Sequence, residues 1–525
     1  VTVTVSAYTA DVGETSNAEG ASGGRIALVA TQGEVAIPLA NLAANGGPGS
    51  KVSGGGTIFV KNAADANGTL LVGTTKGAQW SYVQRYPTPT ATTVVPPGKT
   101  WTFDRVLVRD QGILGVPEGA TLILPNGVAS VGNVKASDTK LQCGLLYMGG
   151  EIRLPETTEH LMKDAWLFEA LVPYTFSGNL RLTGGAGIGN LTLLQPTIEE
   201  SCLNQVVVTG DMTVEKTGKV YARMRGQTHI TGGTMVAAHG GSADAAVATD
   251  VPYDSIFHPR YSGMSGQAKG DSGAQNVGGG AVRLTVLGTL ELNGTIDCAS
   301  QFIEWYAHGG SGGSVDLTVG RLSGSGKIDA SGSGAGGGSK AAGAGGRVAI
   351  KLTDADAVFS DYWKSAILVA GGIGNAGQVG TGYDASAGTI YLQEGAEEDG
   401  AGTIVVRNTG STDIQVPTVL PSQADGNETA KELKNAALSV EKAAIVRLGE
   451  DLSLRAATIA AGSNGKIDLN GKNLTLRVLS LGGEKIPAGV YKVGDAALGD
   501  YVMDSSEGAQ GTVVISSGGF RIIIR

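Results

Sequence analysis

Aromatic and charged side chains that could bind a ligand gather in one segment, residues 236–277, among glycine, alanine and serine. Aromatic rings line ligand sites, and a few placed polar groups give such sites their specificity. The segment therefore suits a sugar polymer, but the same rings would also anchor a long loop to a scaffold, and we favour that second interpretation. The candidate ligand-binding residues, here and in the next loop, are Tyr253, Asp254, His258, Arg260, Tyr261, Trp305, Tyr306 and His308.

Two aspartates are the best candidates for acid–base chemistry. Asp297 and Asp329 occupy matching places in successive repeats, with Lys327 nearby. A lyase or hydrolase needs such groups facing one space, and neighbouring strands would hold these two about 5 Å apart. However, Asp468 stands in the same Gly-x-Ile-Asp context elsewhere in the chain. The pattern therefore indicates a recurring turn, and we name no catalytic residue.

Motifs that would hold a metal ion or a phosphate group are missing from the sequence. It has no EF-hand loop, no calcium-binding nonapeptide, no HExxH and no P-loop. Its glycine-rich runs, such as residues 332–346, do not open helices and so are not phosphate cradles. We expect no metal and no cofactor.

The elements that would position these residues recur at a fixed period. Glycine pairs at Gly279, Gly312 and Gly345 begin 33 residues apart (312 − 279 and 345 − 312), and alternating apolar runs follow them. A constant period of this length is typical of a solenoid, whereas β-sandwich strands show no such repeat. We predict an all-β fold, a parallel β-helix or β-solenoid with long glycine-rich loops. One core column should contain Val282, Leu284, Val315, Leu317, Val348 and Ile350.

An internal duplication accompanies the repeat. Three pairs of segments resemble each other in the same order: 23–28 with 345–350, 56–60 with 388–392, and 68–72 with 402–406. We predict a first solenoid copy over 1–135, a β-rich middle over 136–277 with a long irregular loop at 236–277, regular coils over 278–352, a second copy over 353–480, and a C-terminal β segment over 481–525. The one helix-like stretch is 159–171.

Composition narrows the class of partner. Glycine supplies 84 of 525 residues, the hydrophobic share is 41%, and the formal net charge is −9. That apolar share is too high for a disordered chain, and an acidic chain without a basic cluster is a poor nucleic-acid partner. No apolar run approaches the roughly 18 residues of a membrane span. The three cysteines, Cys143, Cys202 and Cys298, are far apart and cannot all pair with one another.

Several pieces of the sequence resemble glycine-rich repeat proteins secreted by environmental and gut bacteria. These pieces are residues 253–257 with Pro259, 278–284, 312–315, 345–350 and 387–392. The last ninety residues resemble C-terminal repeat segments of exported Lentisphaerae and Verrucomicrobia proteins, in the style of autotransporter-associated repeats. The resemblance implies a β-solenoid that is exported to the cell surface or beyond, after removal of a signal peptide. It carries over no catalytic residue.

The functional expectation is a secreted or cell-surface structural β-solenoid that assembles with copies of itself into a filament or lattice. Alternating apolar strands near both ends of the sequence, with no obvious cap, would pair either between subunits, which would drive assembly, or within their own chain. Two alternatives stay open: a lyase or glycoside hydrolase acting on polysaccharide, and a non-catalytic adhesin that binds cell-surface or plant polysaccharide. The candidate assembly residues are Val1, Val3, Val5, Phe520, Ile522, Ile523 and Ile524.

Overall fold

A computed structural model describes most of the chain, and every structural statement below concerns the residues it describes. These are residues 5–6, 22–44, 55–73, 92–109, 112–133, 144–169, 174–190, 205–226, 238–241, 252–267, 275–302, 307–335, 341–374, 383–408, 416–421 and 428–516. The fold is all-β: strands dominate, and the few helices are one turn long. The helices are η1 (Leu39–Asn41), η3 (Val128–Ser130), α1 (Asp361–Ser365), α2 (Ala430–Leu433) and η6 (Gly499–Tyr501).

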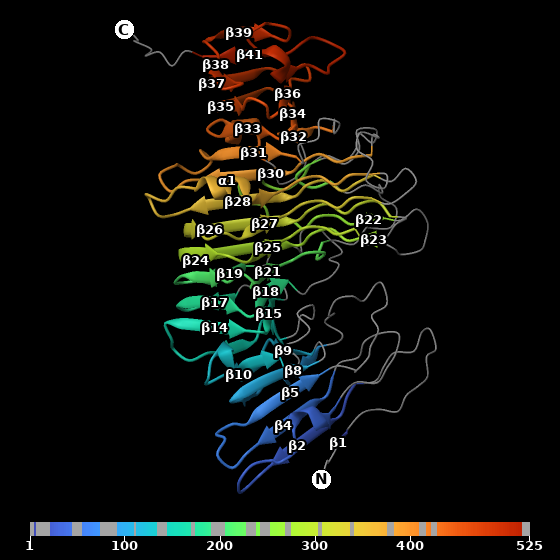
Figure 1. Cartoon of the computed structure of the whole chain (residues 1–525), viewed down its shortest axis with the longest axis vertical. Coiled ribbons are helices and arrows are strands. Elements are labelled where there is room, and N and C mark those ends of the chain that lie inside the picture. The colour runs from blue at the N-terminus through green and yellow to red at the C-terminus, as the bar shows by residue number, and fades with distance from the viewer. Residues whose placement is uncertain are drawn as a thin grey trace.

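The strands stack into one long column, in which β2 and β4 lie at one end and β39 and β41 at the other (Figure 1). The largest sheet has 16 strands. They are β14 (Glu159–Lys163), β16 (Tyr174–Phe176), β17 (Asn179–Thr183), β19 (Gln205–Val208), β20 (Met212–Val214), β24 (Ala281–Leu292), β26 (Ser314–Ser323), β28 (Arg347–Leu352), β30 (Thr389–Gln393), β31 (Thr403–Arg407), β33 (Ala437–Glu441), β35 (Leu452–Ile459), β37 (Leu474–Leu481), β38 (Glu484–Lys485), β39 (Gly489–Lys492) and β41 (Thr512–Ile515).

Smaller sheets accompany it, and most of their pairings are also parallel. A 9-stranded sheet contains β6 (Thr93–Val94), β9 (Ile113–Pro117), β12 (Gly144–Met148), β15 (Trp166–Glu169), β18 (Gly187–Asn190), β21 (Lys219–Tyr221), β25 (Thr295–Asp297), β27 (Lys327–Asp329) and β29 (Ile367–Leu368). A 5-stranded sheet contains β2 (Arg25–Val29), β4 (Thr57–Lys61), β5 (Thr69–Gly73), β8 (Arg105–Arg109) and β11 (Val131–Asn133). The others contain β7 (Thr100–Thr102), β10 (Thr121–Ile123) and β13 (Glu151–Arg153); β32 (Thr418–Leu420), β34 (Ile445–Leu448), β36 (Lys466–Asp468) and β40 (Val502–Met503); β1 (Val5–Ser6) and β3 (Leu42–Ala43); and β22 (Gly266–Gln267) and β23 (Gln275–Asn276).

The predicted core column is confirmed. Val282 pairs with Val315, which pairs with Val348, so residues 33 positions apart are direct neighbours on β24, β26 and β28. All six side chains predicted for the column are buried within one hydrophobic cluster. Period-2 alternation causes this arrangement, because it places every second residue of a strand on the same face.

The direction of pairing reverses at two similar places. Strand β2 pairs with β4 in parallel, β4 with β5 in antiparallel, and β5 with β8 in parallel. The same order recurs for β28, β30, β31 and β33. We call these places the first and the second junction.

The core changes faces of the sheet at each junction. At the second junction, Ile390 and Val405 belong to one hydrophobic cluster, whereas the adjacent residues Tyr391 and Ile404 belong to another. Alternate residues therefore serve cores on opposite sides of the same strands, which explains why both faces of β30 are buried.

The helix expected over 159–171 is wrong. The structure has β14 and β15 there, and β14 pairs in parallel with β17. His160 and Met162 are buried while Glu159 and Lys163 are exposed. This period-2 burial is that of a strand with one buried face. Within the described residues, no helix is long and apolar enough to cross a membrane.

Candidate functional site

Part of the predicted irregular loop crosses the outward face of the large sheet, and we call residues 252–262 the strap. The Arg347 guanidinium on β28 donates to the Tyr253 carbonyl through Nε at 2.8 Å. The Phe257 ring packs on the Tyr391 ring of β30, with centroids 4.5 Å apart. The strap therefore lies on strands that follow it in the sequence by about a hundred residues.

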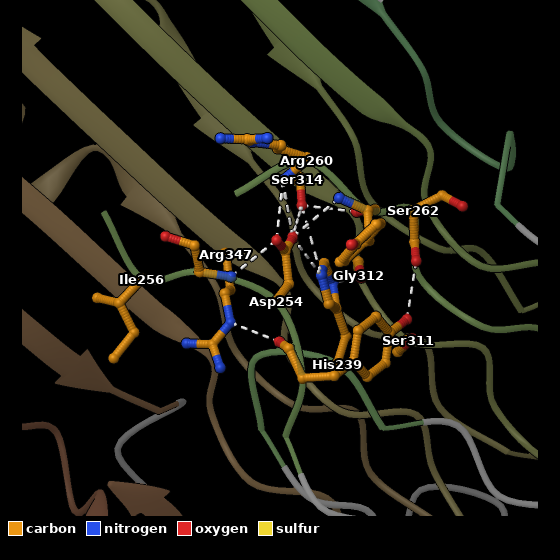
Figure 2. Close-up of polar contacts among 12 residues, drawn as sticks. His239, Asp254, Ile256, Arg260, Ser262, Ser311, Gly312, Ser314 and Arg347 are labelled. Atoms are coloured by element: carbon orange, nitrogen blue, oxygen red, sulfur yellow. Dashed lines mark hydrogen bonds and ion pairs between the residues drawn. The ribbon is translucent and has the colours of Figure 1, made fainter. Parts of the chain in front are cut away.

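Asp254 holds the strap in shape. Its carboxylate accepts hydrogen bonds from the backbone N–H of Ser255 at 2.7 Å, of Arg260 at 2.8 Å and of Tyr261 at 2.9 Å. The hydroxyl of Ser314 on β26 donates to it at 2.9 Å. These contacts are drawn in Figure 2. Backbone N–H groups that are buried need such acceptors. The Asp254 carboxylate therefore stabilises the conformation of the strap.

His239 completes the buried polar cluster. Its Nδ1 lies 2.7 Å from the Gly312 carbonyl oxygen, and its Nε2 lies 3.3 Å from Asp254 Oδ2 and 3.4 Å from Ser314 Oγ. A hydrolytic triad presents serine to one imidazole nitrogen and carboxylate to the other. Here the serine and the carboxylate share one nitrogen and a carbonyl takes the other, and all three side chains are buried. The geometry is that of an anchor.

Glu428 clamps the other side of the strap. Its carboxylate accepts from the backbone N–H of Ile256 at 2.7 Å and of Phe257 at 3.1 Å, and from the Ser255 hydroxyl. Because Ile256 and Phe257 belong to the core cluster of the C-terminal strands, the strap seals the end of that core.

A second group of charged side chains lies at the outer edge of the strap, and we call it the charged cluster. It consists of Asp316 on β26, Arg283 on β24, Lys351 on β28, His258 on the strap and Asp399. Lys351 Nζ lies 2.8 Å from His258 Nε2 and 2.6 Å from Asp399 Oδ1. Arg283 Nε and His258 Nδ1 lie 3.6 and 3.9 Å from Asp316 Oδ2.

Asp316 is the unusual member of the charged cluster. Its side chain is 3% exposed, its Oδ1 has no hydrogen-bond partner, and no hydrogen bond from the described chain reaches its carboxylate. Burial raises the pKa of Asp316 to about 6, although Arg283 opposes the shift. Burial also lowers the pKa of His258, and Lys351 lowers it further. A buried carboxyl that exchanges its proton near neutral pH, beside an imidazole, could act as an acid or a base.

The sequence-predicted residues divide into three sets. Tyr253, Asp254 and His308 are buried, and His308 Nδ1 accepts from the backbone N–H of Ala341 at 3.0 Å. His258 and Tyr261 are half-buried and Arg260 is exposed, with His258 and Arg260 near Asp316. Trp305 and Tyr306 lie outside the described residues. The set thus forms a loop anchor with two residues at its edge, and the described members do not make an aromatic rim.

Sequence reasoning missed the residues of the sheet that meet the strap. Arg283 and Asp316 are direct neighbours in the register of β24 and β26, so the outward positions of the repeat carried a usable signal. Glu428 gave none, because a loop contact between residues 172 positions apart has no periodicity.

Asp297 and Asp329 are neighbours on β25 and β27, as predicted. Each aspartate, like Asp468, accepts a hydrogen bond from the backbone N–H two residues later. Asp297 and Asp468 also accept from arginines, Arg223 at 2.8 Å and Arg447 at 2.7 Å. The shared geometry is that of a turn stabilised by an ion pair, so these carboxylates are structural.

The described residues also show which metal ligands and thiols the chain brings together. It contains no group of three or more histidine, cysteine or acidic residues placed to hold a metal ion. Cys298 is free and buried, and burial raises the pKa of its thiol well above the ordinary value. Cys143 and Cys202 lie outside the described residues.

Comparison with known proteins gave no relative: no family model, no curated protein and no solved structure matches this chain.

Proposed function

We propose that this chain is a parallel β-helix with long glycine-rich loops and an internal duplication, and that it is a structural protein of the cell surface or exterior. Parallel pairing at 33-residue intervals supports the β-helix, because stacked coils bury one continuous column. The repeated pairing order at the two junctions supports the duplication. Export rests on the resemblance to secreted glycine-rich proteins.

The observation that carries self-assembly is the free edge of β2. Strand β28, which resembles β2 in sequence, has β26 on one side and β30 on the other. Within the described residues, β2 pairs with β4 alone. Its residues alternate between exposed positions and the less exposed Ile26 and Leu28, and Val29 is 59% exposed. An unpaired parallel edge with this pattern is a template for a strand of another chain.

The mode of assembly follows from where the edges lie. Strand β2 lies at one end of the column and β39, the last strand of the large sheet, at the other (Figure 1). Contact between unlike ends is heterologous, and without closure it propagates as a filament or lattice. Of the predicted assembly residues, Val5 pairs with Leu42 of the same chain, and the others lie outside the described residues. The intermolecular contact that we propose is therefore at β2 and does not involve Val5.

A lysine at the edge tests this proposal. Val29→Lys should abolish assembly, because an edge lysine would have to lose its hydration when another strand pairs. Val358→Lys is the matched control, since Val358 is 66% exposed and lies in the connection after β28. Light scattering and electron microscopy report the assembly state, and circular dichroism reports the fold. Assembly that survives Val29→Lys in a folded protein would refute the role of β2.

A second candidate function is binding of an acidic polysaccharide, and Asp316 is the observation that favours it. Buried polar groups are normally hydrogen-bonded. A buried carboxylate whose contacts with Arg283 and His258 are longer than hydrogen bonds, and whose Oδ1 has no hydrogen-bond partner, marks a candidate functional site. Oligosaccharides of uronic acids should bind with measurable heat, and Arg283→Ala should weaken that binding while neutral oligosaccharides stay inert. We expect no cleavage. Cleavage that disappears in Asp316→Asn would instead favour the lyase or hydrolase, and equal binding by Arg283→Ala would remove the charged cluster as the site.

A further inference from the structure

The two junctions share side-chain contacts as well as pairing order. In the first, the Thr93 hydroxyl donates to the Gly55 carbonyl at 2.5 Å. In the second, the Thr418 hydroxyl donates to the Ala387 carbonyl at 2.6 Å. The strands that carry the two threonines, β6 and β32, each continue into a further parallel sheet. Positions at one junction can therefore be matched with positions at the other.

Within the described residues, the matched positions differ in what lies on them. At the second junction the strap covers Arg347 and Tyr391, and Ile256 and Phe257 fill the core beside Ile404. Arg347 is fully buried by this contact. At the first junction Arg25 stands in the place of Arg347, and it is exposed.

A cavity lies at the first junction where the strap lies at the second. Its volume is about 310 Å³, enough for a few apolar side chains. Arg25 and Thr57, the counterparts of Arg347 and Thr389, line it. The rest of its wall combines hydroxyl and glycine residues with apolar side chains, and the apolar ones include Leu70, Val94, Trp101, Phe103 and Leu114. Glu428 has no acidic counterpart among the lining residues. The apolar part of the cavity therefore suits the apolar side chains of a segment to whose backbone carbonyl Arg25 would donate, as Arg347 donates to Tyr253.

We propose that this cavity binds residues 517–525 of a second copy, an inference that rests on the proposed self-assembly and names the segment that mediates it. The segment reads SGGFRIIIR. Like the strap, it combines an aromatic residue with aliphatic and basic ones. Phe520 and Ile522 would fill the apolar part of the cavity, as Ile256 and Phe257 fill the core at the second junction.

The occupant must come from another molecule. Strand β41 lies at the end of the column opposite β2 (Figure 1), and residues 517–525 follow it closely in the sequence. Nine extended residues reach at most about 30 Å. More than a dozen strands lie between the two ends, and at about 4.8 Å per strand they span more than about 60 Å. A chain cannot fill its own cavity with this segment, and a head-to-tail neighbour can.

A labelled peptide of residues 517–525 tests the inference on the full-length protein, at a concentration below that of assembly. Fluorescence anisotropy should show saturable binding. Val94→Asp places a charge in the cavity wall at a side chain that is already 42% exposed, and should weaken binding at least about tenfold because the charge would be desolvated. Val358→Asp should bind like the wild type, and a peptide with Phe520→Ser should bind weakly to all three proteins.

The outcomes separate this inference from the proposed function. If the peptide fails to bind while Val29→Lys still abolishes assembly, the inference is wrong and the β2 edge stands. If it binds the wild type and Val94→Asp equally, the peptide lies elsewhere and the inference is also wrong. A third outcome is that the peptide binds the wild type more tightly than Val94→Asp, but the protein does not assemble at any concentration. That outcome would confirm the cavity as the site for residues 517–525 and would refute the proposed self-assembly.

Discussion

Replacing Asp316 by asparagine should stabilise the protein at neutral pH, which few substitutions of a buried residue do. In the folded protein the carboxyl has no hydrogen bond from the described chain, and burial raises its pKa from 3.8 to about 6. A rise of about two pH units, at about 1.4 kcal/mol each, amounts to about 3 kcal/mol of differential stability. At 3% exposure solvent screening reduces this figure little.

The sign of the pH dependence follows from the direction of the shift. Because the folded state holds the Asp316 proton more tightly than the unfolded state, the contribution of Asp316 to stability is most favourable below about pH 4 and declines as the pH rises to about 6. Above that pH the folded protein carries the full free-energy cost of burying the ionised Asp316 carboxylate. Asparagine cannot ionise, so Asp316→Asn should gain up to about 3 kcal/mol at pH 7.5 and nothing at pH 4.

Urea denaturation at pH 4, 5.5 and 7.5, followed by circular dichroism, measures this difference. Asp399→Asn is the control of opposite sign, since the hydrogen bond from Lys351 lowers the pKa of Asp399. At pH 7.5 the Asp399→Asn protein should lose some stability because its ion pair with Lys351 is gone. The loss should be small, because that carboxylate is largely exposed to solvent. The reasoning would be refuted if Asp316→Asn lowered the free energy of unfolding at pH 7.5, or if it changed that free energy by the same amount at pH 4 and at pH 7.5.

Three further predictions concern the core column, the strap and the Asp297 turn. Leu317→Asp should cost several kcal/mol in urea denaturation because it buries an unpaired charge in the core column, whereas Thr318→Asp, facing outward on the same strand, should cost under about 1 kcal/mol; equal costs would contradict the assigned faces. Glu428→Gln should make the strap a site of early cleavage in limited proteolysis while the strands stay protected, and an unchanged digestion pattern would count against the clamp. Asp297→Ala should lower stability by about 1–3 kcal/mol through the lost ion pair and turn, and a loss of ligand binding without a loss of stability would show that the turn assignment is mistaken.

Local pattern determined the all-β class and the shared core of β24, β26 and β28. Val282, Val315 and Val348 are neighbours because a period of 33 residues and an alternation of 2 are properties of the sequence itself, and each strand needs only its own pattern to choose a face. The same rule failed over 159–171, where the apolar residues fit a helical spacing as well as a strand. There the neighbouring strand β17 decided the outcome.

The candidate site was predicted in part. The segment with the strap was found because its composition departs from the repeat, and the preference for a loop anchor agrees with the burial of Tyr253 and Asp254. The residues that give the site its electrostatics were not found. Asp316 looks from the sequence like an ordinary outward residue of an exposed face.

Tertiary structure alone decided that Asp316 is buried, that Glu428 holds the strap and that the strap lies on the second junction. Each outcome depends on which segments contact each other across a large separation in the sequence, as Glu428 contacts the backbone of Ile256. Periodicity fixes which face of a strand a side chain occupies, but burial and pKa depend on what covers that face. The covering comes from a segment far away in the sequence, and no local pattern records the contact.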